Sequence, residues 1–313
     1  MRVADRHGEE ILEAETVIIA TGSRPRRPDS FPIDDRVIVD SDSLLQLDTI
    51  PKSLAILGSG VIGCEYATIF SALGSKVTIV DRREQPLRFL DSDILDALTH
   101  SMRARGIRIM HSEEISGVRI ETRKREHEGV VYTRSGRTVR AERVLVSAGR
   151  VANTAALDLE SIGIQTDSAG LIKVDETYQT SVPNVYTIGD VIGFPALAST
   201  SMHQGRLAVL HVAGQEPPPA ADLPMAIFTI PEISSVGLTE DQCRQQGLPY
   251  EVGVARTNET PRGQIVRDEG LLKLIFRRDT KQILGHSKSS ALEKWRWRWK
   301  SLDSLFKGSS NTG

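Results

Sequence analysis

Apolar segments and amphipathic segments alternate along most of the chain. Residues 53–58 and 76–81 are largely apolar, as in strands that are covered on both faces of a sheet. Between them, residues 61–73 carry apolar positions at helical spacing, and Gly74 marks the end of the predicted helix. The pattern predicts a strand–helix–strand unit and therefore an α/β protein.

The same alternation continues on both sides of this unit. Upstream, residues 15–23 (ETVIIATGS) predict a short buried strand that ends at a turn, and the Pro-rich residues 23–32 predict a loop. Downstream, Asp91 or Ser92 is the expected N-cap of an amphipathic helix, which Gly106 ends before a third strand.

Farther along, the periodicity changes to two. Residues 115–122 and 129–136 alternate polar and apolar positions, which predicts an antiparallel meander. Residues 143–150 (RVLVSAGR) and the run NVYTIGD, which begins at Asn184, predict two further buried strands. Residues 201–214 predict a helix.

The last part of the chain differs in its pattern of apolar and polar residues. A Pro cluster at residues 214–224 is typical of a linker, and strands are expected on either side of a short helix at residues 239–246. The C-terminal segment holds all three tryptophans, in WRWRWK, and fits none of the preceding patterns. Such a mixture of cations and aromatics can bind RNA or a membrane surface, but we interpret it as a divergent tail.

Composition narrows the function classes. The 313 residues carry a formal net charge of −2, with 39% hydrophobic and 26% charged residues, as in a globular protein with a sizeable core. This balance favours neither nucleic acid nor membrane as a partner. No signal peptide or membrane-spanning run is readable, and two cysteines make no disulfide framework, so we expect a cytoplasmic protein. We expect no metal site, because the histidines and cysteines do not cluster.

A dinucleotide fingerprint lies between the first strand and the first helix. Its six residues are Gly58, Ser59, Gly60, Val61, Ile62 and Gly63, which match G-x-G-x-x-G. In this context the glycines permit a tight turn, approach of a pyrophosphate, and close helix packing. Asp81 ends the next strand and is expected to accept hydrogen bonds from a ribose diol, which favours NAD. Arg82 or Arg83 could instead hold the 2′-phosphate of NADP; a solvated surface role for both arginines stays open.

Several motifs in order resemble one family. VIIATGSRPRRP, GVIGCEYATIF, VLVSAGR, YQTSVPNVYTIGDVIG and TIPEISSVGLTE are similar to the FAD/NAD-linked pyridine nucleotide-disulfide oxidoreductases related to dihydrolipoamide dehydrogenase. The resemblance covers about residues 3 to 286. It implies a Rossmann-like NAD(P)-binding domain inserted into a partial FAD-binding domain of similar fold, plus an incomplete α+β interface domain.

The resemblance implies five segments with these bounds: residues 1–47 and 156–217 for the FAD-binding domain, 48–155 for the NAD(P)-binding domain, 218–286 for the start of the dimerisation domain, and 287–313 for the divergent tail.

The resemblance also assigns cofactor contacts. Ala20, Thr21 and Gly22 would lie near the adenosine end of FAD, and Gly189 and Asp190 at its ribityl and phosphate portion. The helix start at Leu197, Ala198 and Ser199 would point its dipole at the isoalloxazine. Gly149 would join the NAD(P) contacts.

Glu65 matches the family glutamate that lies under the nicotinamide and pairs with a lysine near the flavin. A surface position in the first turn of the helix is the plain alternative. We interpret its neighbour Cys64 as a small packing residue, because buried free cysteines usually are.

Within the family, Phe194-Pro195 after Gly-Asp favours the transhydrogenase branch, which passes hydride between NADPH and NAD+ through FAD. NADH and NADPH are then the expected substrates, with the preference between them open. We expect these residues to lack the N-terminal FAD half and the C-terminal end of the family, to bind FAD weakly, and to be impaired in activity. The alternatives are a dihydrolipoyl dehydrogenase and an inactive NAD(H)-binding fragment. The family forms homo-oligomers; for this chain the oligomeric state stays open.

Overall fold

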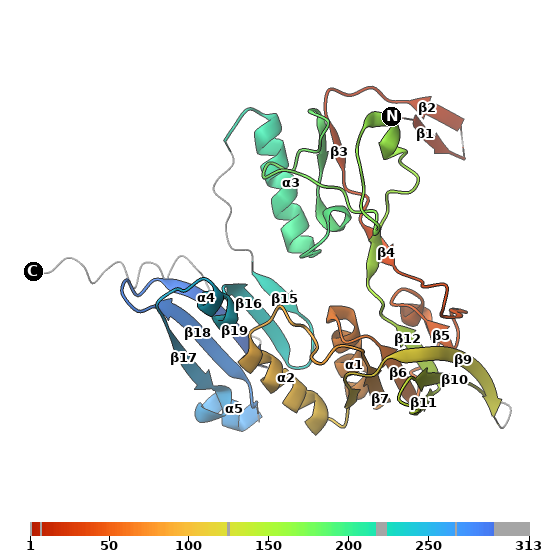
Figure 1. Ribbon diagram of the computed structural model, residues 1–313, viewed down its shortest axis with the longest axis vertical. Coiled ribbons are helices and arrows are strands. Elements are labelled where there is room, and N and C mark those ends of the chain that lie inside the picture. The colour runs from red at the N-terminus through yellow and green to blue at the C-terminus, as the bar shows by residue number, and fades with distance from the viewer. Residues whose placement is uncertain (1, 7, 124–125, 217–223, 267, 291–313) are drawn as a thin grey trace, which may run out of the picture. The chain divides into compact units, whose positions relative to one another are not determined.

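The computed structural model describes residues 2–6, 8–123, 126–216, 224–266 and 268–290. It divides into two compact units, each described by itself below. The first unit comprises residues 1–26 and 149–221, and the second comprises residues 27–148 and 222–313. Figure 1 labels many of the helices and strands of both.

A five-stranded parallel sheet forms the centre of the second unit. Its strands, in spatial order, are β5 (Ile38–Val39), β12 (Arg143–Val146), β6 (Ser53–Leu57), β7 (Lys76–Val80) and β8 (Arg108–Met110). The helices α1 (Val61–Ala72) and α2 (Ser92–Ala104) connect β6 to β7 and β7 to β8. The predicted strand–helix–strand unit and the α/β class are confirmed.

Alternation of side chains in β6 explains how both faces of this sheet are covered. Leu54 and Ile56 belong to a core that they share with α1 and α2, whereas Ala55 and Leu57 belong to a second core on the other face. That second core is closed by the antiparallel meander of β9 (Ile115–Arg123), β10 (Glu126–Thr133) and β11 (Thr138–Ala141), as the sequence predicted.

The ends of the helices follow local chemistry. Asp91 is the N-cap of α2, and its side chain accepts a hydrogen bond from the Asp93 N–H. Gly74 and Gly106 follow α1 and α2 with φ of +94° and +82°, a conformation that glycine adopts without strain. A short 3₁₀ turn, η1 (Ser43–Gln46), precedes β6.

An antiparallel sheet forms the rest of the second unit. In spatial order it contains β15 (Met225–Ile227), β16 (Glu232–Gly237), β19 (Ile283–Ser290), β18 (Leu271–Arg277) and β17 (Tyr250–Arg256). Helix α4 (Glu240–Gln245) confirms the predicted short helix. Three further elements were not predicted: β17, η4 (Thr257–Glu259) and α5 (Pro261–Val266). Ile227, Ile233 and Leu271 extend the core of α1 and α2 into this sheet.

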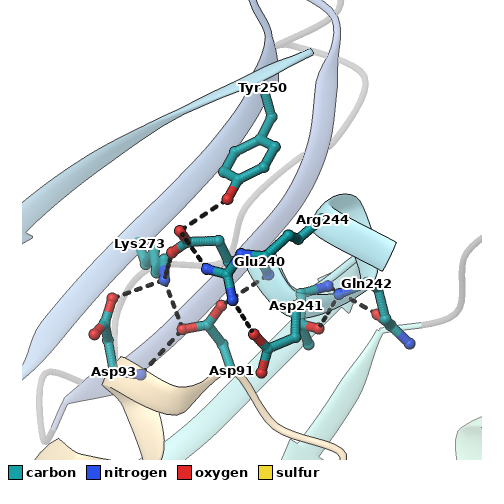
Figure 2. A network of polar contacts seen from close by, with 9 residues as sticks. Asp91, Asp93, Glu240, Asp241, Gln242, Arg244, Tyr250 and Lys273 are labelled. Atoms are coloured by element: carbon teal, nitrogen blue, oxygen red, sulfur yellow. Dashed lines mark hydrogen bonds and ion pairs between the residues drawn. The ribbon is translucent and has the colours of Figure 1, made fainter. Parts of the chain in front are cut away.

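A buried ammonium group joins strand β18 to the starts of helices α2 and α4. Lys273 on β18 is 1% exposed, and its Nζ lies 2.8 Å from Asp91 Oδ1, 2.7 Å from Asp93 Oδ2 and 2.7 Å from Glu240 Oε2. Figure 2 shows the three carboxylates converging on it from α2 and α4. These contacts raise the pKa of Lys273 against the opposing effect of burial, so the amine stays protonated.

The first unit contains small sheets and one long helix. A hairpin pairs β1 (Arg2–Asp5) with β2 (Gly8–Ile11); β3 (Val17–Ile19) runs parallel to β14 (Val185–Thr187); β4 (Ser23–Pro25) pairs with β13 (Arg150–Ala152). The 3₁₀ turns η2 (Leu159–Ile162) and η3 (Gly189–Ile192) and helix α3 (Ala198–Val212) complete it. The helix predicted at residues 201–214 is confirmed, and β14 is buried as expected.

Two expectations for the first unit were wrong. The strand predicted in residues 15–23 is buried on one face only: Ile19 is 9% exposed and belongs to the core of this unit, whereas Ile18 is 40% exposed, because β3 pairs only with β14 among the described residues and the face of Ile18 has no cover. The Pro-rich loop begins with a strand, β4. Pro25 is tolerated there because a two-stranded ribbon leaves one edge of each strand free of ladder bonds.

The domain bounds predicted from the resemblance stay predictions, since the two compact units group the chain differently. Much of the Pro cluster and the tail from residue 291 lie outside the described residues.

Lys273→Met is expected to lower the free energy of unfolding by about 3 kcal/mol, because it leaves the buried carboxylate of Asp91 without its cation. Urea denaturation followed by circular dichroism measures this. Lys76→Met, at an exposed position, is the matched control and should change stability by less than about 0.5 kcal/mol. Equal stability of the two variants would contradict the role given to Lys273.

Candidate functional site

The loop between β6 and α1 has a geometry that only glycine satisfies. Gly58 has φ of +108°, its N–H donates to the Val80 carbonyl at 2.9 Å, and a Cβ there would lie 2.7 Å from the Ser147 carbonyl oxygen. A Cβ on Gly63 would overlap the carbonyl group of Gly58, so the helix packs directly on the turn. Both glycines are therefore fixed by packing within the protein.

Gly60 differs from its two neighbours, because the space beside it is open. The nearest atom to a Cβ built there is Arg83 Nη2, 4.0 Å away. Gly60 is the N-cap of α1 and provides no side chain to cap it, so the first N–H groups of the helix have no partner within it. An open backbone beside an uncapped helix N-terminus fits a phosphate group.

Asp81 lies at the end of β7, beside this loop. Its Oδ2 accepts from Ser59 N at 2.5 Å, from Ser59 Oγ at 2.6 Å and from Arg83 Nη2 at 2.7 Å; its Oδ1 accepts from Arg83 N at 2.8 Å. Burial by itself would raise the pKa of Asp81, but the hydrogen bonds from Arg83 and Ser59 outweigh burial and bring the pKa to about 2. The carboxylate is therefore ionised at any physiological pH.

The two arginines after Asp81 behave differently. Arg83 folds back onto the Asp81 carboxylate while 42% of its side chain stays exposed. Arg82 is exposed. From the sequence, either arginine was a candidate for binding a 2′-phosphate, and the structure brings only Arg83 to the glycine loop.

Glu65, one turn into α1, is held by the antiparallel sheet. Its Oε1 accepts a hydrogen bond from the Phe228 N–H at 2.8 Å, and the side chain is half-buried. Burial raises the pKa of Glu65, and the bond from Phe228 opposes that rise. The surface alternative is wrong for this residue. A role under the nicotinamide stays a prediction.

Thr68, one turn farther along α1, makes a second bond of this kind, accepting from the Ile230 N–H at 3.0 Å.

Cys64, on the same helix, is fully buried in the core, where burial raises the pKa of its thiol to about 12. This agrees with its interpretation as a packing residue.

The predicted flavin contacts lie in the first unit, around Asp190. Its Oδ2 accepts from Ser23 Oγ at 2.8 Å, and Arg150 Nε lies 4.0 Å away. Gly189 has φ of +80°, and its N–H donates to Gln204 Oε1 at 2.7 Å. The hydrogen bond from Ser23 therefore orients the Asp190 carboxylate through Oδ2, and Oδ1 can accept a hydrogen bond from a ligand hydroxyl.

The start of α3 lies in the same unit. Leu197 is the N-cap and provides no side-chain cap, and Ala198 and Ser199 form the first turn. The hydroxyl groups of Thr187 and Thr200 are buried and have no hydrogen-bond partner among the described residues. Uncapped N–H groups with buried hydroxyls in the same unit fit a polar cofactor such as FAD.

The remaining predicted contacts are glycines and neighbours in turns. Thr21 and Gly22 follow β3, and their carbonyls accept from the side chain and the backbone N–H of Asn153. Ala20 is exposed between them and the strand. Gly149 has φ of +95° and opens the second segment of the first unit, while the fingerprint lies in the second unit. Their assignments to FAD or NAD(P) stay predictions.

Sequence reasoning missed the residues that orient these groups. Ser59 sits inside the fingerprint at a position that accepts any residue, yet it supplies two donors to Asp81. Ser23, Arg150 and Gln204 orient the turn at Gly189 and Asp190 from elements distant in sequence. The available signal was the recurrence of a polar residue after glycine at three strand ends, Gly22-Ser23, Gly58-Ser59 and Gly149-Arg150; no such signal points to Gln204.

Two further searches cover only the described residues. No helix there has the length and apolar character needed to cross a bilayer. The same residues contain no group of three or more His, Cys, Asp and Glu side chains arranged to hold a metal ion.

Comparison with protein-family models gives two matches. Residues 2–205 match the model described as "Pyridine nucleotide-disulphide oxidoreductase", and residues 223–290 match the dimerisation domain of the same name. Together these matches cover most of the chain.

Comparison with curated proteins finds close relatives. The chain is 45% identical over 278 residues to proteins named soluble pyridine nucleotide transhydrogenase from Yersinia pestis (strain Pestoides F) and Yersinia pseudotuberculosis serotype O:1b. The alignment covers 88% of this chain and 59% of each relative, so the chain spans less than two thirds of their length.

Among solved structures, LpdA from Mycobacterium tuberculosis is 29% identical with a TM-score of 0.84, covering 93% of this chain and 63% of that one. The HOCl-induced flavoprotein disulfide reductase RclA from Escherichia coli is 28% identical with a TM-score of 0.84, covering 98% of this chain and 68% of that one.

Glu65→Ala should increase the hydrogen-exchange rate of the Phe228 amide roughly 2- to 10-fold, because the N–H loses its acceptor. Amide exchange followed by NMR measures this rate. Glu65→Gln keeps an acceptor oxygen and should stay near the wild-type rate. The same rate in all three proteins would show that Glu65 does not hold this segment.

Iodoacetamide at pH 8 is expected to leave Cys64 unmodified in the folded chain. A thiol with a pKa of about 12 has almost no thiolate at that pH, and the buried sulfur is inaccessible. Mass spectrometry after digestion reads the modification, and the chain in urea is the control that should react. Equal reaction of folded and unfolded chains would place Cys64 outside the core.

Proposed function

Because the chain belongs to the pyridine nucleotide-disulphide oxidoreductase family, we propose that it functions in flavin-dependent hydride transfer between NADPH and NAD+, as a Si-specific transhydrogenase. The open backbone at Gly60, beside the uncapped start of α1, is the observation that carries the proposal. The relatives named as transhydrogenases, at 45% identity, support this reaction over others of the family.

In this proposal the second unit binds the nicotinamide nucleotide. The N–H groups at the start of α1, including those of Val61 and Ile62, hold the pyrophosphate, which approaches along Gly60. Asp81 and Arg83 face the adenosine ribose, because they end the strand next to the fingerprint. Glu65 is the residue of α1 placed toward the nicotinamide end.

The first unit, by this proposal, contributes to binding FAD, which when bound would supply the electron acceptor and donor between the two nucleotides. Asp190 would accept a hydroxyl of the cofactor through the oxygen not used by Ser23. The uncapped α3 N-terminus would stabilise negative charge near it. We infer a homo-oligomer from the match to the dimerisation domain. The cytoplasmic location and the segment bounds stay proposals made from the sequence and the resemblance.

The purified 313-residue chain should bind NADPH and NADH, seen as a change in nicotinamide fluorescence. These residues contain one G-x-G-x-x-G, which we assign to the nicotinamide nucleotide, so FAD affinity should be low. Reduction of thio-NAD+ by NADPH is therefore expected only when FAD is added, and weakly. Gly60→Val, which fills the open space beside the loop, should abolish nucleotide binding.

The outcomes separate the alternatives. A stoichiometric flavin spectrum in protein purified without added FAD contradicts weak FAD binding. FAD-dependent oxidation of dihydrolipoamide in place of thio-NAD+ reduction supports a dihydrolipoyl dehydrogenase. Nucleotide binding without any turnover supports the inactive NAD(H)-binding fragment, and no binding overturns the proposal.

A further inference from the structure

The carboxylate of Asp81 has no free side toward a ligand in this structure. Arg83 covers it through Nε, 3.2 Å from Oδ1 and 3.1 Å from Oδ2, and through Nη2, 2.7 Å from Oδ2. Ser59 occupies Oδ2 from the protein side, and the carboxyl side chain is 4% exposed. A ribose diol needs a carboxylate oxygen as acceptor, so it cannot reach Asp81 while Arg83 stays in this position.

We propose that Arg83 is the residue that sets nucleotide specificity, acting as a latch on Asp81. In the closed state, the Arg83 guanidinium lies on the Asp81 carboxylate, as in this structure, and binds a 2′-phosphorylated ribose. In the open state, the guanidinium has moved away and Asp81 can bind an unphosphorylated ribose diol. This inference rests on the proposed nucleotide-binding function and names how one site reads both NADP(H) and NAD(H).

The closed position suits a phosphate. A guanidinium group has five N–H donors, and the bonds to Asp81 use Nε–H and one donor of Nη2, which leaves Nη1 and the second Nη2 donor. Nη2 is the atom nearest to Gly60, and 42% of the side chain is exposed, so these donors lie at the open side of the loop. A 2′-phosphate can therefore bind without breaking the Asp81–Arg83 pair.

The charges favour the same state. A phosphate monoester placed beside the ionised Asp81 would be repelled, and the interposed guanidinium neutralises one carboxylate while it pairs with the phosphate. Without Arg83 the two anions face each other. Loss of Arg83 should therefore be more harmful to NADPH binding than loss of an ordinary surface cation.

The open position suits a diol. The bonds to Ser59 and the bond from the Arg83 backbone N–H do not depend on the guanidinium, so Asp81 keeps its orientation when that group leaves. When Arg83 Nε and Nη2 leave, the Asp81 carboxylate lone pairs that accepted their hydrogen bonds become available to ribose hydroxyls. NADH binding must displace Arg83 and is opposed by the latch.

Arg82 is the internal comparison. It follows Asp81 directly and carries the same charge, but it is exposed and makes no hydrogen bond with Asp81 in the described structure. General attraction of phosphate by basic surface would require both arginines, whereas the latch requires Arg83 alone.

Titration of the 313-residue chain with NADPH and with NADH, followed by nicotinamide fluorescence and calorimetry, tests the latch. Arg83→Ala should weaken NADPH binding by about 10-fold or more and leave NADH binding unchanged or tighter. Arg83→Lys keeps the charge but loses the fork, and should retain only part of the preference. Arg108→Ala removes an exposed arginine at the start of β8, at the end of the parallel sheet opposite to the fingerprint loop, and should change neither affinity.

A measurement on the wild type needs no variant. The affinity for NADPH should fall more steeply with salt than that for NADH, and the affinity for 2′,5′-ADP should exceed that for 5′-ADP. Arg83→Ala should remove both differences.

Equal weakening of NADPH and NADH by Arg83→Ala, or loss of NADPH preference in Arg82→Ala instead, overturns the latch and leaves the proposed function standing. Absence of any salt or 2′-phosphate effect in the wild type does the same. Failure of the wild type to bind either nucleotide overturns the proposed function and the latch together.

Discussion

The ammonium of Lys273 is the contact on which the second unit depends. Lys273 and Asp91 are both 1% exposed, so either charge would be left without water if the other were lost, whereas Asp93 and Glu240 pair with the ammonium from more exposed positions. Asp91 serves three purposes there: it caps α2, binds the ammonium, and accepts the Glu240 N–H at 3.1 Å. The start of α2, the start of α4 and the middle of β18 are therefore fixed by one set of atoms (Figure 2).

That fixed frame positions the chemistry. Helix α1 packs in the same core as α2 and β18, and its N-terminus is where we propose that the phosphate binds. Its Glu65 and Thr68 bind the backbone that follows β15. Because α1 is held in this way, the close contacts of Gly58 and Gly63 with the backbone around them can be maintained. Within one turn of α1, the chain passes from the exposed backbone at Gly60 to Cys64 in the rigid core.

Which features could be predicted from the sequence depended on how far apart along the chain the interacting residues lie. The unit from β6 to β7 could be predicted, because hydrophobic period, cap and glycine stop all lie within 30 residues or so of one another. Burial of β3 could not, since it depends on a cover that other segments must supply. Lys273 in LLKLIF looked like an ordinary polar position in a strand, and its partner Asp91 lies 182 residues away. The difference between Arg82 and Arg83 is a matter of side-chain direction, which charge alone does not reveal.

The two kinds of contact between α1, α2 and the antiparallel sheet have different evolutionary freedom. Glu65 and Thr68 bind main-chain N–H groups, which every residue except proline supplies at positions 228 and 230. The sheet can drift in sequence there without loss. Lys273, Asp91, Asp93 and Glu240 are tied by charge and must change together. In a recombinant that takes residues 223–290 from a relative, compatibility therefore depends on this quartet as well as on the core contacts of Ile227, Ile233 and Leu271.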